Sequence, residues 1–90
     1  MYERLLAVNP DNPKGLKNYG HVLIDLGRAG EAVPRLERAL SIDPNYCGAK
    51  NTLGRAYLAI GKKESARKQF ELALVCDPGL LNAKKNLESL

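Results

Sequence analysis

The residues best suited to covalent chemistry in this 90-residue chain are one histidine, His21, and two cysteines, Cys47 and Cys76. An imidazole beside a thiol can remove its proton and make it a nucleophile. When the sequence is aligned with itself at an offset of 34 residues, however, Cys76 falls on Ile42 and Val8. This position predicts a small buried hydrophobic residue. We therefore do not expect a catalytic Cys–His pair.

No other catalytic or metal-binding motif is present. The sequence lacks a zinc-protease helix motif, a nucleophile elbow and a glycine-rich phosphate loop, and its single histidine and two cysteines do not form a metal-ligand cluster. Two cysteines are also too few for a disulfide scaffold, although a single bridge between them stays open. We expect no enzymatic activity, no cofactor and no metal.

The composition is that of a globular chain, with 44% hydrophobic and 27% charged residues. Its length fits one small domain or a fragment of a longer protein. No apolar run approaches the roughly 18 residues of a membrane span, and no secretory signal follows the N-terminus. We therefore expect a cytoplasmic protein. The net charge of +4 gives a mild preference for acidic partners.

The strongest pattern in the sequence is an internal repeat of 34 residues, in which small and turn-forming residues recur. The aligned pairs are Gly20 with Gly54, Gly27 with Gly61, Ala32 with Ala66, Glu37 with Glu71, Ala39-Leu40 with Ala73-Leu74, and Asp43-Pro44 with Asp77-Pro78. This predicts two full units, residues 13–46 and 47–80, flanked by the partial units 1–12 and 81–90.

Each unit is expected to form two helices, because apolar residues recur at steps of three and four. Gly27 should end the first helix of the first unit, since glycine readily takes the left-handed conformation found at helix ends. Pro44 should follow the end of the second helix. Within that second helix, Pro34 is expected in the first turn, where a missing N–H is tolerated. The chain should thus be all-α, with about six helices.

These residues resemble the tetratricopeptide repeat (TPR) family, whose 34-residue pattern places leucine-glycine, tyrosine, alanine, phenylalanine and proline at fixed positions. The second unit matches the pattern with Leu53-Gly54, Tyr57, Ala66, Phe70 and Pro78, and departs from it where Lys50 replaces an aromatic residue. The resemblance implies a right-handed solenoid of helix pairs. It also implies an adaptor or scaffold that binds a peptide or partner helix along the groove lined by the first helix of each unit.

The two ends of the chain are expected to differ. Residues 1–12 should form the second helix of a preceding partial repeat, which would leave Tyr2, Leu5 or Leu6 uncovered and could allow self-association. This pattern is typical of a segment from a longer array. Residues 81–90 should form a C-terminal capping helix, with Leu87 and Leu90 toward the core and a polar outer face.

If the groove lies where the resemblance implies, it is lined by the polar side of the first helices. The residues on that side are Lys14, Lys17, Asn18, His21, Asp25, Asn51, Thr52, Arg55, Asn82, Lys85 and Asn86. Lysine, arginine and asparagine side chains can donate hydrogen bonds to the carboxylates and backbone of an acidic or extended peptide. The alternative is that these residues are polar only because they face solvent.

Two narrower hypotheses follow from the resemblance. Chaperone-binding members hold a terminal carboxylate at positions occupied here by Lys17, His21, Thr52, Asn82 and Asn86. Only Lys17 matches, so chaperone C-terminal tails are not expected as partners. Alternatively, Asn18, Thr52 and Asn86 lie 34 residues apart, like the asparagine ladder of O-GlcNAc-transferase-like superhelices, although Thr52 interrupts it.

Two other functions stay open. A cluster of basic residues could attract the phosphates of RNA or another polyanion. It consists of Lys62, Lys63, Arg67, Lys68, Lys84 and Lys85. Acidic residues lie between these cations and few aromatic residues are left for base stacking, so nucleic acid is an unfavoured partner. The chain could also be a spacer within a longer solenoid that binds nothing itself.

Overall fold

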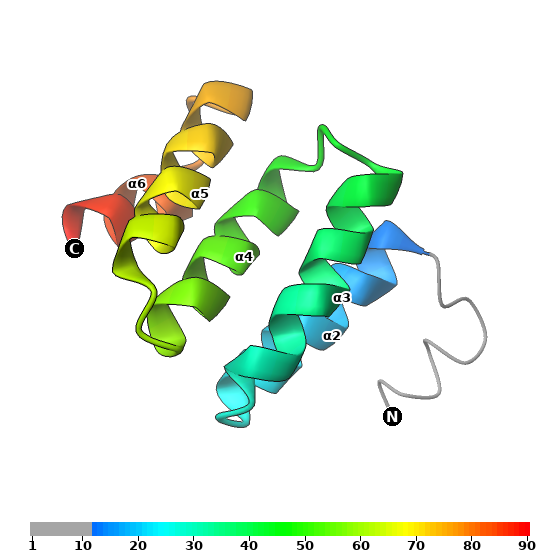
Figure 1. Ribbon diagram of the computed structural model, residues 1–90. Helices are drawn as coiled ribbons and strands as arrows, with labels where there is room; N and C mark the ends of the chain where they lie inside the picture. The colour runs from blue at the N-terminus through cyan, green and yellow to red at the C-terminus, as the bar shows by residue number, and fades with distance from the viewer. Residues whose placement is uncertain (1–11) are drawn as a thin grey trace.

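The computed structural model describes residues 12–90. Within this range the chain forms helices and no strand (Figure 1). The helices are α2 (Pro13–Asp25), α3 (Ala29–Ile42), α4 (Cys47–Ala59), α5 (Lys63–Cys76) and α6 (Leu81–Glu88). The prediction of an all-α chain is confirmed. The helix expected within residues 1–12 falls almost entirely outside the described residues.

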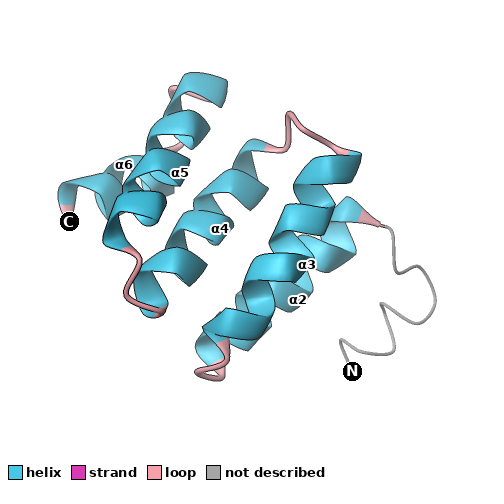
Figure 2. Cartoon of the chain, viewed as in Figure 1, coloured by secondary structure: helices cyan, strands magenta, loops and turns pink. Residues whose placement is uncertain are grey.

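The helices stack in two layers. Helices α2, α4 and α6 contact one another in that order, whereas α3 packs on α2 and α4, and α5 packs on α4 and α6 (Figures 1 and 2). Short loops join each helix to the next, so neighbours along the chain run antiparallel. One layer therefore consists of α2, α4 and α6, which begin at the residues where the predicted units begin, and the other of α3 and α5.

Glycines end the first helix of each pair, as expected. Gly27, which follows α2, has a φ of +77°, and Gly61, which follows α4, has a φ of +83°. After Gly27, the N–H of Arg28 donates to the carbonyl of Leu23 at 2.7 Å, which satisfies a carbonyl at the helix end. The same bonding after Gly61 gives both helix pairs the same tight turn.

Local sequence also explains where α2 begins. The side chain of Asn12 accepts hydrogen bonds from the backbone N–H groups of Lys14 and Gly15, at 3.0 and 3.4 Å, and Pro13 occupies the first turn. The prediction for Pro34 was wrong in one respect. Helix α3 begins at Ala29, so Pro34 lies in its second turn, and the helix nevertheless continues to Ile42.

The core lies between the two layers. Its largest fully buried side chains are Phe70, Leu23 and Leu36. The glycines of the repeat face two of them, because a Cβ atom on Gly54 would lie 2.5 Å from a Phe70 ring carbon and one on Gly20 would lie 2.9 Å from Cγ of Leu36. These glycines therefore give the large side chains of the second helices room to lie against the first helices.

A disulfide bond joins Cys47, the first residue of α4, to Cys76, the last residue of α5, with their Cα atoms 5.6 Å apart. The interpretation of Cys76 as a buried thiol was therefore wrong. It is partly exposed and covalently bonded, because two antiparallel helices bring the start of one beside the end of the other. Both sulfurs also lie 3.5 Å from the carbonyl oxygen of Asn45, in the loop before α4.

The C-terminal helix is attached more lightly than the others. Its only fully buried residue is Ala83, and Leu87 and Leu90 are half-buried. None of the helices between residues 12 and 90 has the length and apolar character that crossing a membrane requires.

Candidate functional site

The layer of α2, α4 and α6 carries the residues predicted to line the groove, and we call the side on which they lie the polar face. On α2 the predicted residues lie three, four, seven and eleven residues after Lys14, so they share one side of the helix with it. They are Lys14, Lys17, Asn18, His21 and Asp25. Helix α4 supplies Asn51, Thr52 and Arg55, and helix α6 supplies Asn82, Lys85 and Asn86.

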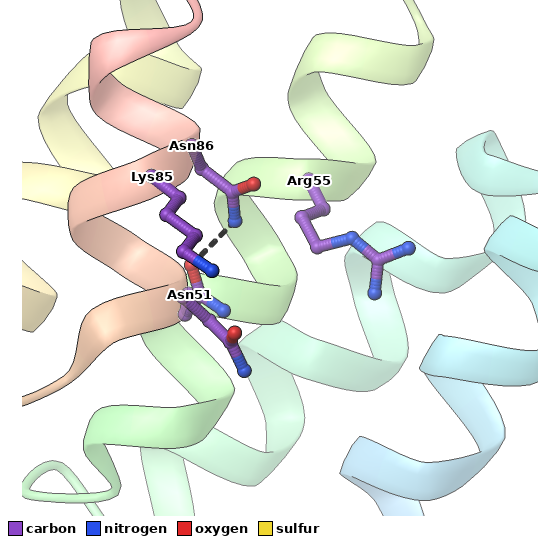
Figure 3. A pocket seen from close by; sticks show the side chains of 5 residues that line it. Asn51, Arg55, Lys85 and Asn86 are labelled. Atoms are coloured by element: carbon purple, nitrogen blue, oxygen red, sulfur yellow. Dashed lines mark hydrogen bonds between the residues drawn. The ribbon is translucent and has the colours of Figure 1, made fainter.

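A pocket of about 270 Å³ opens on the polar face between α4 and α6 (Figure 3). It is lined by Asn51, Arg55, Asn82, Lys85 and Asn86, all of which were predicted as site residues. The lining holds two cations, three carboxamides and no acidic group. Such a set favours an anionic ligand, since guanidinium and ammonium groups bind carboxylates and amides can bind a peptide backbone.

A hydrogen bond between two carboxamides orders one wall of the pocket. The Nδ2 group of Asn86 donates to Oδ1 of Asn51 at 3.0 Å, joining α6 to α4 (Figure 3). Asn51 is only 8% exposed, so this bond also satisfies a nearly buried oxygen. With its oxygen occupied as an acceptor, Asn51 keeps an amide N–H for donation.

Arg55 connects the pocket to α2. One guanidinium nitrogen lies 2.8 Å from Nδ1 of His21, and another lies 3.8 Å from a carboxylate oxygen of Asp25. His21 and Asp25 are themselves 3.5 Å apart through Nε2 and Oδ2, one turn apart on α2. Figure 3 shows the Arg55 guanidinium turned away from Asn51 and Lys85. In this structure, therefore, Arg55 contributes mainly its stem to the pocket.

Other predicted residues are not brought into the pocket. The ammonium of Lys17 lies 5.7 Å from the centre of the Tyr46 ring, and Lys14 and Asn18 lie outside the lining. Thr52 is only 6% exposed, and its hydroxyl donates to the Gly48 carbonyl of its own helix at 3.0 Å. The asparagine ladder is therefore broken at Thr52, whose side chain is unable to reach a ligand on the polar face.

Two groups with shifted pKa values lie outside the pocket. Burial raises the pKa of the Tyr57 hydroxyl, and the nearby carboxylate of Glu37, which accepts a hydrogen bond from it at 3.3 Å, raises it further. Two hydrogen bonds from the Arg28 guanidinium lower the pKa of the exposed Glu31 carboxyl. These contacts connect α4 with α3 and hold the start of α3, so we assign them to the fold.

Two features of the site were missed by reasoning from sequence. The first is the contact of Lys17 with Tyr46, a loop residue that no repeat position marks. The second is the link between His21 and Arg55, which lie 34 residues apart and so occupy the same place in successive units. The repeat contained the signal for this second contact, because equal positions on stacked helices are neighbours.

Comparisons with known proteins agree with the fold. A family model described as tetratricopeptide repeat matches residues 23–84. A comparison with curated proteins found no match. Among solved structures, the chain is similar to the first TPR domain of the human RPAP3 protein, determined by NMR, with a TM-score of 0.91 and 25% identity over 98% of this chain and 69% of that one.

Two further similar structures contain peptides. The first TPR of Spaghetti (RPAP3) bound to the HSP90 peptide SRMEEVD has a TM-score of 0.89 and 25% identity over 98% of this chain and 70% of that one. The second TPR domain of human RPAP3 in complex with the HSP70 peptide SGPTIEEVD has a TM-score of 0.88 and 26% identity over 98% of this chain and 73% of that one.

These complexes overturn one expectation. Chaperone C-terminal tails were judged unlikely partners because four of the five carboxylate-binding positions do not match, and that exclusion was wrong. Residue types at fixed places in the repeat do not determine the charge of the folded surface. The structure brings two cations, Arg55 and Lys85, to the polar face from other places, so a mismatch at the fixed places does not remove the basic character of the surface.

Proposed function

Because the chain belongs to the tetratricopeptide repeat family, we propose that it is an adaptor that binds an extended acidic peptide along the polar face. The observation that carries this proposal is the pocket between α4 and α6, which combines two cations with three carboxamides and no acidic group. A TPR domain is in general a module for protein interaction, so we assign a binding role rather than a catalytic one.

The residues of the pocket can contribute to peptide binding in two ways, by charge attraction and by hydrogen bonding to the peptide backbone. Lys85 is an exposed residue of the lining, and its ammonium can attract a ligand carboxylate. Asn51 and Asn82 offer amide groups that donate to, and accept from, the backbone of an extended chain. A peptide held in this way needs acidic side chains or a free C-terminus, but little further sequence identity.

The peptides in the related complexes have this chemistry. Both end in Glu-Glu-Val-Asp, so they present acidic side chains close to a terminal carboxylate. We propose peptides of this class, acidic and with a free C-terminus, as ligands of the chain. The peptide SRMEEVD is a suitable probe, because its net negative charge complements the net charge of +4 on the protein.

Reversing the charge of Lys85 tests the proposal. We expect Lys85→Glu to weaken binding of SRMEEVD about tenfold or more, because it places a carboxylate where the ligand needs a cation. Isothermal titration calorimetry at low ionic strength measures the effect, and circular dichroism checks that the helices are intact.

Lys84→Glu is the matched control. Lys84 is the adjacent residue, also exposed on α6 but absent from the pocket lining. Its variant has the same net charge as Lys85→Glu, because both replace a lysine by glutamate. We expect it to change binding by less than about twofold, as exposed charges outside a site usually do. Equal weakening by both variants would indicate nonspecific attraction and contradict the proposed site.

We also propose a cytoplasmic location. It is supported by the low number of cysteines, two in 90 residues, since secreted domains of this size usually carry several disulfides. The bond between Cys47 and Cys76 weighs against it, because cytoplasmic thiols are kept reduced. Alkylation of both cysteines in intact cells would support this location, and a bond that persists there would contradict it.

A further inference from the structure

The contact between Arg55 and His21 fits one tautomer of the neutral histidine ring. A guanidinium has only N–H donors, so its short contact of 2.8 Å with Nδ1 of His21 is a hydrogen bond only if Nδ1 carries no proton. The proton of the neutral ring then lies on Nε2, facing the Asp25 carboxylate 3.5 Å away. The structure therefore shows the arrangement that a neutral imidazole permits.

Protonation of His21 removes this arrangement. Both ring nitrogens then carry protons, so Nδ1 can no longer accept from Arg55, and two positive groups face each other across 2.8 Å. The charged imidazole at the same time gains attraction to Asp25, which lies beside it on α2. Arg55 loses its hydrogen-bond partner on α2 and competes with His21 for the same carboxylate.

We propose that His21 is a positioning residue, whose protonation releases Arg55 from α2 so that the guanidinium can turn into the pocket and bind a ligand carboxylate. The inference rests on the proposed function, since it concerns the same pocket and the same class of acidic peptide. Arg55 already lines the pocket with its stem, so only rotation of the distal side chain is required (Figure 3).

The charged groups around His21 are those expected if its protonation releases Arg55 from α2. On α2 itself, Asp25 contacts the ring, and Lys17, one turn earlier, has its ammonium at the Tyr46 ring. From α4, Arg55 is the charged residue that reaches His21. Helix α3 packs on the other side of α2, where Arg35 lies over the ring of Tyr19, 5.4 Å from its centre. Among residues 12–90, Asp25 and Arg55 thus decide what a proton on His21 does.

The expected consequence is tighter binding of acidic peptides at low pH. An imidazole gains a proton as the pH falls, whereas most ligand carboxylates stay ionised down to about pH 5.5. The pocket then gains a released guanidinium and a nearby imidazolium, both partly exposed. We expect SRMEEVD to bind roughly fivefold more tightly at pH 5.5 than at pH 8, as partly exposed ion pairs allow.

Two variants separate His21 from other titrating groups. His21→Asn places a neutral acceptor near the place of Nδ1 and removes the titrating ring, so its affinity for SRMEEVD should no longer depend on pH between pH 8 and pH 5.5. His21→Lys carries a permanent positive charge, so at pH 8 it should bind as tightly as the wild type does at pH 5.5. His21 is exposed, and neither change disturbs the core.

The experiment has one arm without peptide and one with it. Without peptide, NMR should show the Arg55 side-chain Nε–H signal shifting in step with the titration of the His21 ring. With peptide, calorimetry should give the fivefold change in the wild type and its loss in His21→Asn. Titration of His21 without any change at Arg55, or equal pH dependence in wild type and His21→Asn, would overturn the inference. Absence of SRMEEVD binding at both pH values would overturn the proposed function and, with it, the role of His21 in binding, whatever the first arm shows.

Discussion

Breaking the disulfide between Cys47 and Cys76 is expected to lower the free energy of unfolding by about 3–4 kcal/mol, a large fraction of the stability of a domain of this size. The bond closes a loop with a sequence separation of 29, and closing such a loop restricts the unfolded chain. It also ties the start of α4 to the end of α5, next to the loop that leads into α6. Urea unfolding of the oxidised and reduced protein measures the difference.

The double variant Cys47→Ala/Cys76→Ala is the control for reduction. It should unfold at the lower urea concentration found for the reduced wild type, and added reductant should not change it further. A thiol assay on the oxidised protein should detect no free cysteine. Two free thiols in protein purified without reductant, or equal unfolding midpoints for the two redox states, would contradict the bond shown here.

Replacing Gly54 by leucine is expected to destabilise the domain by about 3 kcal/mol, at the upper end of overpacking effects. A Cβ atom at this position would lie 2.5 and 2.7 Å from two carbons of the Phe70 ring. Phe70 is fully buried, so its ring has no free space into which it can move. Helices α4 and α5 must therefore separate, and thermal unfolding should show a markedly lower midpoint.

Gly30→Ala is the matched control for this substitution. Apart from its chain neighbours and the backbone of its own helix, nothing lies within 4 Å of the position that a Cβ on Gly30 would take, and Gly30 lies within α3. Alanine there should leave stability unchanged or raise it slightly, because glycine is a poor helix former. If Gly54→Leu unfolded at the same temperature as the wild type, the close approach of α4 and α5 would not be required for stability.

Most of the helical framework could be predicted from local sequence. Gly27 and Gly61 ended their helices because glycine alone takes a positive φ without strain, and the repeat placed both. Pro34 was misplaced by one turn, since the start of α3 at Ala29 depends on the preceding tight turn rather than on an N-cap side chain. The division into units and the capping role of α6 stay predictions.

The residues of the pocket could be predicted, whereas their role in binding stays a prediction. All five residues of the pocket were among the predicted site residues, because the polar side of the first helices follows directly from their periodicity. Side-chain partners could not be predicted in the same way. Thr52 bonds to its own helix and Lys17 reaches an aromatic loop residue, and both choices depend on the packed distances between helices.

The disulfide partner of Cys76 likewise could not be predicted from the sequence. The alignment of Cys76 with aliphatic residues in other units predicted burial, but its pairing with Cys47 depends on the antiparallel packing of α4 on α5, which brings the two Cα atoms to 5.6 Å. The exclusion of chaperone tails failed for a related reason. It compared single positions, whereas the basic character of the polar face comes from residues such as Arg55 and Lys85 at other positions.

The central claim is that an acidic peptide binds on the face formed by α2, α4 and α6. NMR spectra of isotope-labelled protein, recorded while SRMEEVD is added, test it most directly. The account predicts that the largest chemical-shift changes occur at Asn51, Arg55 and Asn86, with little change along the exposed sides of α3 and α5. Changes concentrated on α3 and α5, or none at saturating peptide, would contradict it.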